Sequence, residues 1–98
     1  MVTETPRLAR RHIHVDGVVQ GVGFRPFIYG LALRYALTGW VLNSSSGVDI
    51  EAQAAPDVLD AFQAAITAEA PPLARIDQVS AQPLGPGFRR RLHSIAAE

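Results

Sequence analysis

The fold and the candidate site depend on one segment, Gly17–Phe27, which reads Gly-Val-Val-Gln-Gly-Val-Gly-Phe-Arg-Pro-Phe. Its glycines at positions 17, 21 and 23 allow positive φ angles, so successive backbone N–H groups can converge on one point. Pro26 suits the first position of a helix, because an N–H there would have no partner. Arg25 comes just before it, beside the positive end of the helix dipole. The segment predicts an anion site, although a glycine-rich turn with a surface arginine also fits it.

Two common phosphate-binding loops do not match this segment. A P-loop requires lysine and then serine or threonine after its last glycine, where this chain has Phe24 and Arg25. A dinucleotide-binding loop that starts at Gly21 requires glycine or alanine at position 26, which is proline. The segment therefore predicts an anion site without a nucleotide-binding motif.

The composition indicates one small globular domain. The 98 residues are 48% hydrophobic, which is typical of a folded chain rather than a disordered one. Nine basic residues balance nine acidic ones, so no net positive charge favours nucleic acid, and we interpret the arginine clusters near both ends as solvated. The absence of cysteine excludes disulfides and thiolate metal sites. No apolar run suits a signal peptide or a membrane span, so we expect a cytoplasmic protein.

Hydrophobic periodicity predicts alternating strands and helices. The clearest strand is Val48–Gln53, in which the apolar residues point inward and the acidic and amide residues outward. From Phe24 the period becomes helical, with positions 24, 27, 28, 31 and 35 on one face. The predicted elements are strands His12–Asp16, Trp40–Leu42, Val48–Gln53 and Ile76–Ala81, a weaker fifth strand Phe88–Ile95, a helix from Phe24 to Thr38-Gly39, and a helix from Pro56 to before Pro71. The order predicts a ferredoxin-like βαββαβ sandwich, an antiparallel α/β fold with both helices on one face of the sheet.

Several of these residues resemble a known family. Val19–Arg25, followed by Gly39-Trp40-Val41 and Asn43, is similar to the acylphosphatase signature. Pro26-Phe27 and Pro71–Asp77 resemble more particularly the acylphosphatase-like domain at the N-terminus of the hydrogenase-maturation carbamoyltransferase. The resemblance implies an acylphosphatase-like domain over residues 12–95, between tails of residues 1–11 and 96–98, in a chain that is a fragment of a larger protein.

The resemblance also implies the site residues. Arg25 and Asn43 would be the catalytic pair, with the arginine binding phosphate oxygens and the asparagine orienting the attacking water. The substrate would be an acyl phosphate, carbamoyl phosphate in the carbamoyltransferase branch, whose weakly basic leaving group needs no metal or cofactor. The side chain of Gln20 would support the loop or contact the substrate. The expected phosphate-binding residues are Gln20, Gly21, Val22, Gly23, Phe24 and Arg25.

The other chemistry-bearing residues are interpreted as structural. His12 and His14 lie on one strand face without a third metal ligand, so we expect them to be solvated or packed on the sheet. Asp49 and Glu51 resemble an acidic pair, but outward residues of an alternating strand are usually solvated. Trp40 is expected to serve packing, and the serines at positions 44–46 a turn.

Two alternatives stay open, a stand-alone acylphosphatase and a phosphate-binding or docking module without turnover in isolation, and a third, an RNA-binding module, is disfavoured. A stand-alone acylphosphatase would carry the same site and end after this domain. An RNA-binding module of the same layout would present aromatic side chains on its third strand, and Val48–Gln53 has none. A ligand-sensing or docking domain would have no reason to hold Arg25 and Asn43 together. We expect as partners an acyl phosphate or inorganic phosphate and the remaining domains of a parent protein, with no nucleic acid and no membrane.

Overall fold

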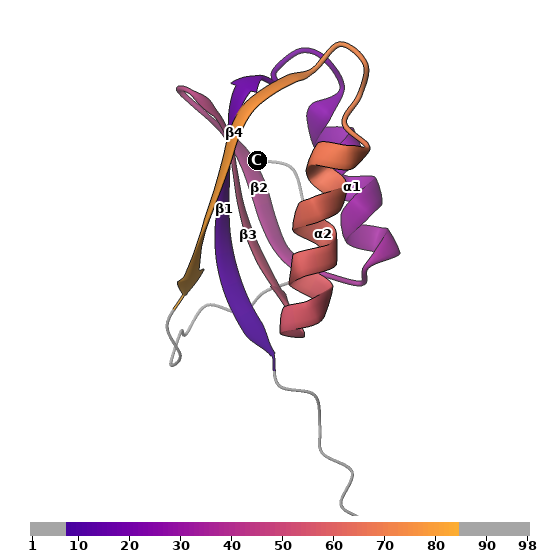
Figure 1. Cartoon of the computed structure of the whole chain (residues 1–98), viewed down its shortest axis with the longest axis vertical. Helices are drawn as coiled ribbons and strands as arrows, with labels where there is room; N and C mark the ends of the chain where they lie inside the picture. Colours follow the sequence, from indigo (N-terminus) through magenta and orange to yellow (C-terminus); the bar gives the residue numbers. More distant parts are fainter. Residues whose placement is uncertain (1–7, 85–98) are drawn as a thin grey trace, which may run out of the picture.

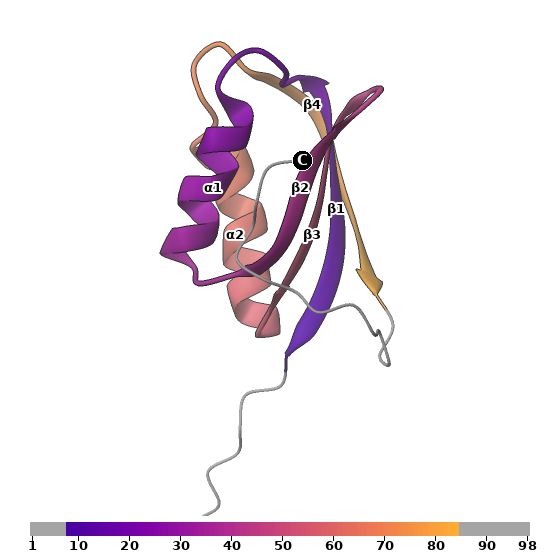
Figure 2. The same cartoon turned by 180° about the vertical axis from the view of Figure 1, so that it is seen from behind.

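The computed structural model describes residues 8–84, which form a four-stranded antiparallel sheet with two helices on one face (Figure 1). The strand order is β2-β3-β1-β4, and the reverse view in Figure 2 shows both helices on the same side. The elements in chain order are β1 (Ala9–Val18), α1 (Phe24–Arg34), β2 (Thr38–Ser44), β3 (Gly47–Ala54), α2 (Pro56–Ala68) and β4 (Arg75–Leu84). The predicted ferredoxin-like βαββαβ sandwich is confirmed.

The strands are longer than predicted. β1 begins at Ala9 rather than at His12, because β3 continues to Ala54 and pairs with it there. Part of the segment expected as an N-terminal tail therefore belongs to the sheet. The expected fifth strand, Phe88–Ile95, and the expected C-terminal tail, 96–98, lie outside the described residues.

The core lies between the helices and alternate residues of the central strands. Ile13 and Val15 of β1 pair with Ile50 and Val48 of β3, and all four side chains are completely buried. Burial of each large apolar side chain stabilises the fold by about 1.5–3 kcal/mol. The helical residues buried here are Phe24, Ile28, Leu31 and Ala32 of α1 and Leu59, Phe62, Ala65 and Ile66 of α2, while Phe27, Tyr35 and Val58 pack against the core partly buried.

The helix α1 ends at Arg34, before the predicted end at Thr38-Gly39. Ala36 has a φ of 56°, in the left-handed region, and the N–H of Leu37 donates to the carbonyl of Ala32 over 2.9 Å. This Schellman arrangement usually contains glycine at the left-handed position. The prediction is wrong because it took the first glycine after the helical pattern as the end of the helix, whereas an alanine occupies the left-handed position.

Gly39 has a different role, within β2. Its φ is 144°, and a Cβ atom there would lie 1.8 Å from the carbonyl oxygen of Glu51. The backbones of β2 and β3 therefore approach too closely at this point for any side chain, which explains why glycine is required.

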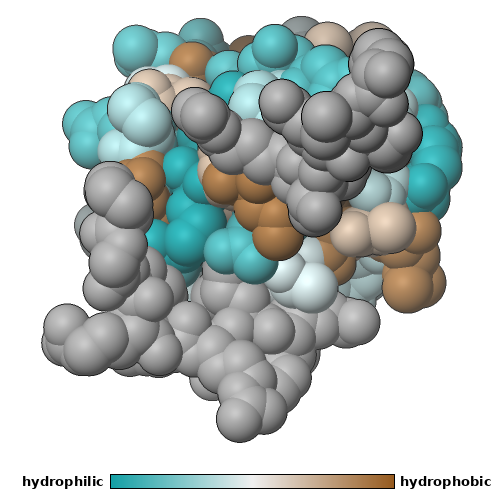
Figure 3. All heavy atoms as spheres, turned by 90° about the horizontal axis from the view of Figure 1, so that it is seen from below, coloured by the Kyte–Doolittle hydropathy of each residue, from teal (hydrophilic) through white to brown (hydrophobic). Residues whose placement is uncertain are grey.

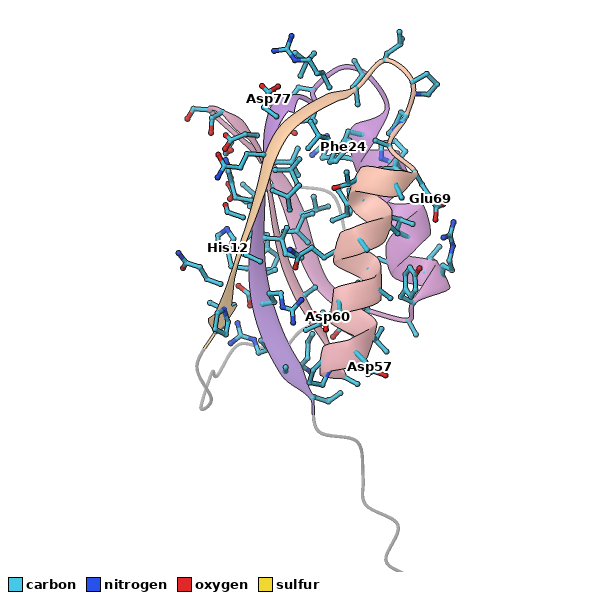
Figure 4. The ribbon with its side chains drawn as sticks, in the orientation of Figure 1. His12, Phe24, Asp57, Asp60, Glu69 and Asp77 are labelled. Carbon is cyan, nitrogen blue, oxygen red and sulfur yellow. The ribbon has the colours of Figure 1, made fainter. Side chains whose placement is uncertain are left out.

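Charged side chains on the sheet face away from the helices contact one another. Glu51 of β3 is 7% exposed and forms an ion pair with Arg10 of the neighbouring strand β1. The prediction that the outward acidic residues of β3 are solvated is therefore wrong. Because β3 lies between β1 and β2, side chains of both neighbours cover its outward residues. Figure 4 shows His12 on this face and Phe24 on the helix side.

The His14 side chain lies between two carboxylates on the same face. Its Nδ1 atom is 2.7 Å from Oδ1 of Asp49, and its Nε2 atom is 3.0 Å from Oδ1 of Asp16. Both ring nitrogens can donate at once only in the charged imidazolium. The hydrogen bond to Asp49 raises the pKa of His14 against the opposing effect of burial. His12 also contacts Asp49, at 2.9 Å, so the two histidines form a hydrogen-bonded network on the sheet.

The large apolar side chains on the surface are scattered. Leu8, Val18, Leu33 and Leu73 are exposed and come from different parts of the chain. The end-on view in Figure 3 shows small groups of hydrophobic residues among hydrophilic ones. Neither α1 nor α2, the helices of the described part of the chain, has the length and apolar character needed to cross a bilayer. Scattered exposure of this kind is ordinary for a folded protein surface.

The substitution Ala36→Gly should raise the free energy of unfolding by about 1 kcal/mol, because glycine adopts the left-handed conformation without a Cβ penalty. Urea denaturation followed by circular dichroism measures the change. The matched control is Ala61→Gly, at an exposed position inside α2, which should lower the same quantity by about 0.5–1 kcal/mol. Destabilisation by both substitutions would contradict the role given to Ala36.

The stability that His14 contributes should fall as the pH rises. The pKa of His14 is raised in the folded state. Its contribution to the free energy of unfolding is therefore complete below about pH 6.5, the ordinary pKa of histidine, and is lost as the pH rises past the higher pKa of the folded state. The pKa of Asp49 is lowered, since hydrogen bonds from His12 and His14 outweigh burial, so its contribution is lost on acidification below about pH 4.

The measurement is urea unfolding of the wild type and His14→Gln between about pH 4 and about pH 9. The difference in unfolding free energy between the two proteins should be largest at about pH 5–6 and shrink toward alkaline pH. A difference that grows at alkaline pH would show that His14 is not held as the imidazolium.

Candidate functional site

The loop of residues 19–23 joins β1 to α1 and turns at two glycines. Gly21 and Gly23 have φ angles of 73° and 80°, in the left-handed region that the sequence predicts for them. Gly23 is the N-cap residue of α1 and forms no side-chain cap. The N–H groups of the first helical turn therefore have no competing acceptor from this residue. Loop and helix end together present backbone donors suited to an anion.

Arg25 lies inside the first turn of α1 rather than just before the helix. The helix begins at Phe24, as the apolar period predicts, and the assignment of Pro26 to its first position is therefore wrong. Proline is tolerated at this place because the N–H groups of the first turn have no acceptor within the helix. Phe24 is 1% exposed, and its burial extends the helix to this residue. The side chain of Arg25 is therefore attached at the N-terminal end of α1, which is the positive end of the helix dipole.

One cavity of about 260 Å³ is lined by both members of the predicted catalytic pair. Asn43 is near the end of β2 and pairs with Val48 of β3, whose side chain faces the helices. Paired residues of neighbouring strands point to the same face, so Asn43 projects toward the helix layer. The lining residues are Val19, Gln20, Gly21, Gly23, Phe24, Arg25, Pro26 and Asn43. Val22 is not among the lining residues, and its side chain packs partly buried against the core. The expectation for Val22 concerns its backbone N–H and stays a prediction.

The side chain of Gln20 points to the hairpin between β2 and β3. Its Nε2 atom donates to the carbonyl oxygen of Ser44 at 2.8 Å and to that of Gly47 at 3.0 Å. The sequence left open whether this side chain supports the loop or contacts the substrate. These hydrogen bonds favour the first role, because they attach the loop to the hairpin. Spacing along the chain could not have revealed them, because the acceptors are backbone atoms of another element.

The other residues that could carry chemistry pack against neighbours or form a turn. The ring of Trp40 meets that of His12 edge-on, with centroids 6.4 Å apart and planes at 76°. Ser45 and Ser46 form the two-residue turn between β2 and β3, as predicted, whereas Ser44, also expected in the turn, is the last residue of β2. Within residues 8–84, no three His, Asp or Glu side chains are placed as a metal site would require. The groups suited to an anion are therefore those of the cavity beside α1.

The sequence pattern of the acylphosphatase family matches residues 11–91 of the chain. An acylphosphatase from Pediococcus pentosaceus is 43% identical over 70 residues, which cover 70% of this chain and 78% of the relative. The carbamoyltransferase HypF2 of Cupriavidus necator is 53% identical over 74 residues, which cover 76% of this chain but 9% of the relative. The chain thus spans about a tenth of the length of that carbamoyltransferase.

Solved structures give the same two kinds of relative. Full-length HypF in a phosphate- and nucleotide-bound form matches 97% of this chain with a TM-score of 0.87 and 33% identity, over 12% of its own length. The acylphosphatase of Bacillus subtilis matches 93% of this chain with a TM-score of 0.77 and 32% identity, over 97% of its own length. The fold and the sequence therefore agree on one family.

The substitution Gly23→Ala should lower the free energy of unfolding by about 1–2 kcal/mol, because alanine pays a penalty for the left-handed conformation. Apart from Gly23 itself and its two chain neighbours, no heavy atom of the described residues lies within 4 Å of a Cβ at this position, so a clash is not the cause. The same change should weaken binding of inorganic phosphate, since relieving the strain turns the loop amides. Gly23→Asn is the control and should lose less, because asparagine tolerates this conformation. Urea unfolding and calorimetric titration measure both quantities, and equal losses would contradict the explanation.

Proposed function

The chain belongs to the acylphosphatase family, and we propose that it hydrolyses acyl phosphates in the cavity between residues 19–25 and Asn43. The observation that carries the proposal is this shared cavity. One side supplies a guanidinium, a left-handed glycine loop and a helix N-terminus, all of which favour a phosphate group. The other side supplies a carboxamide, which can both donate and accept a hydrogen bond.

The loop side would hold the phosphoryl group. Arg25 would bind two phosphate oxygens with its planar fork, and backbone amides between Gln20 and Arg25 would bind the others. Phosphoryl transfer passes through a loose transition state, so positioning and charge stabilisation provide most of the catalysis. Positioning requires rigid supports. Arg25 lies at the start of α1 and Asn43 near the end of β2, so both side chains are attached to regular secondary structure.

Asn43 would orient the attacking water. The water oxygen forms a bond to phosphorus as the bond between phosphorus and the acyl oxygen breaks. The leaving carboxylate or carbamate takes the electron pair, and the proton of the water passes to solvent or to the phosphate product. Because this leaving group is weakly basic, the step needs no strong general acid. A carboxamide is a poor base, but it is sufficient to orient the attacking water.

The relatives support a more specific role within a larger protein. We propose that residues 12–95 form the N-terminal domain of a cytoplasmic carbamoyltransferase and that the substrate is carbamoyl phosphate. Support comes from the 53% identity to a carbamoyltransferase of which the chain covers 9%. The stand-alone enzyme is the alternative, favoured by the 78% coverage of the Pediococcus acylphosphatase. The coding frame beyond Glu98 separates the two, since a transferase sequence with paired-cysteine motifs supports the first and a stop codon the second.

The substitutions Arg25→Ala and Asn43→Ala should each lower kcat by about a hundredfold, or about 3 kcal/mol, by analogy with the loss of an oxyanion donor. Arg25→Ala should also weaken inhibition by inorganic phosphate, whereas Asn43→Ala should leave it nearly unchanged. The measurement is phosphate release from carbamoyl phosphate by the 98-residue chain, corrected for spontaneous breakdown.

Arg25→Lys should also lower kcat and weaken inhibition by phosphate, because a point charge cannot reproduce the guanidinium fork. The matched control is Arg34→Lys at the other end of α1, where Arg34 binds the exposed Glu69 at 2.8 Å and 2.9 Å, and its activity should equal that of the wild type. Equal loss of phosphate affinity in both alanine variants would refute the division of roles. A folded wild type that binds phosphate without turnover would instead support a docking module.

A further inference from the structure

The side chain of Gln20 bridges two parts of the molecule that are separate in the sheet. Its Nε2 atom donates to the carbonyl oxygens of Ser44 and Gly47, at 2.8 Å and 3.0 Å, on the two sides of the β2–β3 turn. Both partners are acceptors, so the nitrogen of the carboxamide must face them. Both side-chain N–H groups are then used, and the carboxamide of Gln20 has no proton left to donate to a phosphate oxygen, whereas its backbone N–H is unaffected.

This bridge joins the two halves of the proposed site. Arg25 follows β1 through the loop, whereas Asn43 lies on β2, and the strand order places β3 between β1 and β2. Ser44 directly follows Asn43, so the hydrogen bond to its carbonyl is formed next to the residue expected to hold the water. A second contact crosses the same junction, from the N–H of Gly17 to the carbonyl oxygen of Ser46 at 3.5 Å.

The position of Asn43 near the tip of the β2–β3 hairpin makes such a bridge useful. Asn43 and Ser44 are the last residues of β2, and Ser45 and Ser46 form the turn that follows. The tip of a hairpin opens more readily than the middle of a sheet. A displacement of about 1 Å between catalytic groups can cost about a hundredfold in rate. The cross-link by Gln20 opposes such a displacement of Asn43 relative to the phosphate-binding loop.

We infer that the side chain of Gln20 has a positioning role: it keeps Asn43 in register with the phosphate-binding loop and does not itself bind the phosphate. The inference rests on the proposed acyl phosphate hydrolysis. It chooses between the two roles that the sequence left open for this side chain, support of the loop and contact with the substrate, and it gives the β2–β3 hairpin a role in the site.

The first test uses Gln20→Met, which keeps the length of the side chain but removes both donors. This variant should lower kcat for carbamoyl phosphate by about tenfold to a hundredfold, while the inhibition constant of inorganic phosphate changes by less than about threefold. Gln78→Met, at an exposed glutamine of β4, is the matched control and should behave as wild type. An inhibition constant that rises in step with the loss of kcat would show a phosphate ligand and overturn the inference.

A double-substitution cycle separates positioning from general destabilisation. If Gln20 acts through Asn43, adding Gln20→Met to Asn43→Ala should lower kcat by less than about twofold, because the group being positioned is already gone. A loss as large as in the wild-type background would overturn the inference.

A second measurement does not depend on turnover. Hydrogen exchange of the Gly17 amide, followed by NMR, reports on the junction because this N–H donates to Ser46. Gln20→Met should speed this exchange by about tenfold relative to the wild type and to Gln78→Met, with the exchange of core amides unchanged. Unchanged exchange at Gly17 would overturn the inference. A wild-type chain without turnover would refute the proposed hydrolysis, while the exchange result would still decide whether Gln20 holds the hairpin.

Discussion

The architecture depends on β1, which is hydrogen-bonded along both edges, to β3 and to β4. Its inward side chains, Ile13 and Val15, are fully buried beneath the helices, and its outward His12 and His14 are bound to Asp49 of β3. A strand constrained on both edges and both faces cannot shift its register without exposing apolar residues to water. The loop of residues 19–23 leaves from this strand, so the same packing determines where α1 begins.

The distribution of polar groups explains why so few residues remain for chemistry. On the sheet face away from the helices, the acids and histidines form ion pairs with one another, as His14 does with Asp16 and Asp49. The cavity beside α1 instead has an arginine, a carboxamide and backbone donors. These groups stabilise charge and fix orientation, but they are poor acids and bases. Such a set suits a reaction whose leaving group is already weakly basic, as the proposed function requires.

The sequence predicted the helices and strands well and their ends less well. Alternation in Val48–Gln53 and the helical period after Phe24 identified the correct inward faces, because burial demands apolar residues at fixed spacing. The end of α1 was misplaced because Ala36 takes a conformation that glycine usually takes. The apolar period placed its start correctly at Phe24, but the assignment of Pro26 to the first helical position was wrong, because the helix already contains Phe24 and Arg25. Both errors arise where a single-residue preference is interpreted without the packing around it.

By itself the sequence determined the order of the elements, the left-handed turn at Gly21 and Gly23, and the resemblance that pointed to Arg25 and Asn43. These are properties of neighbouring residues or of a recognisable motif. Only the tertiary structure decided that Asn43 and the loop line one cavity and that the Gln20 carboxamide binds the hairpin. These contacts join residues distant in the chain, and they depend on strand order and register. Strand order and register are formed by backbone hydrogen bonds between strands, which local sequence patterns do not specify.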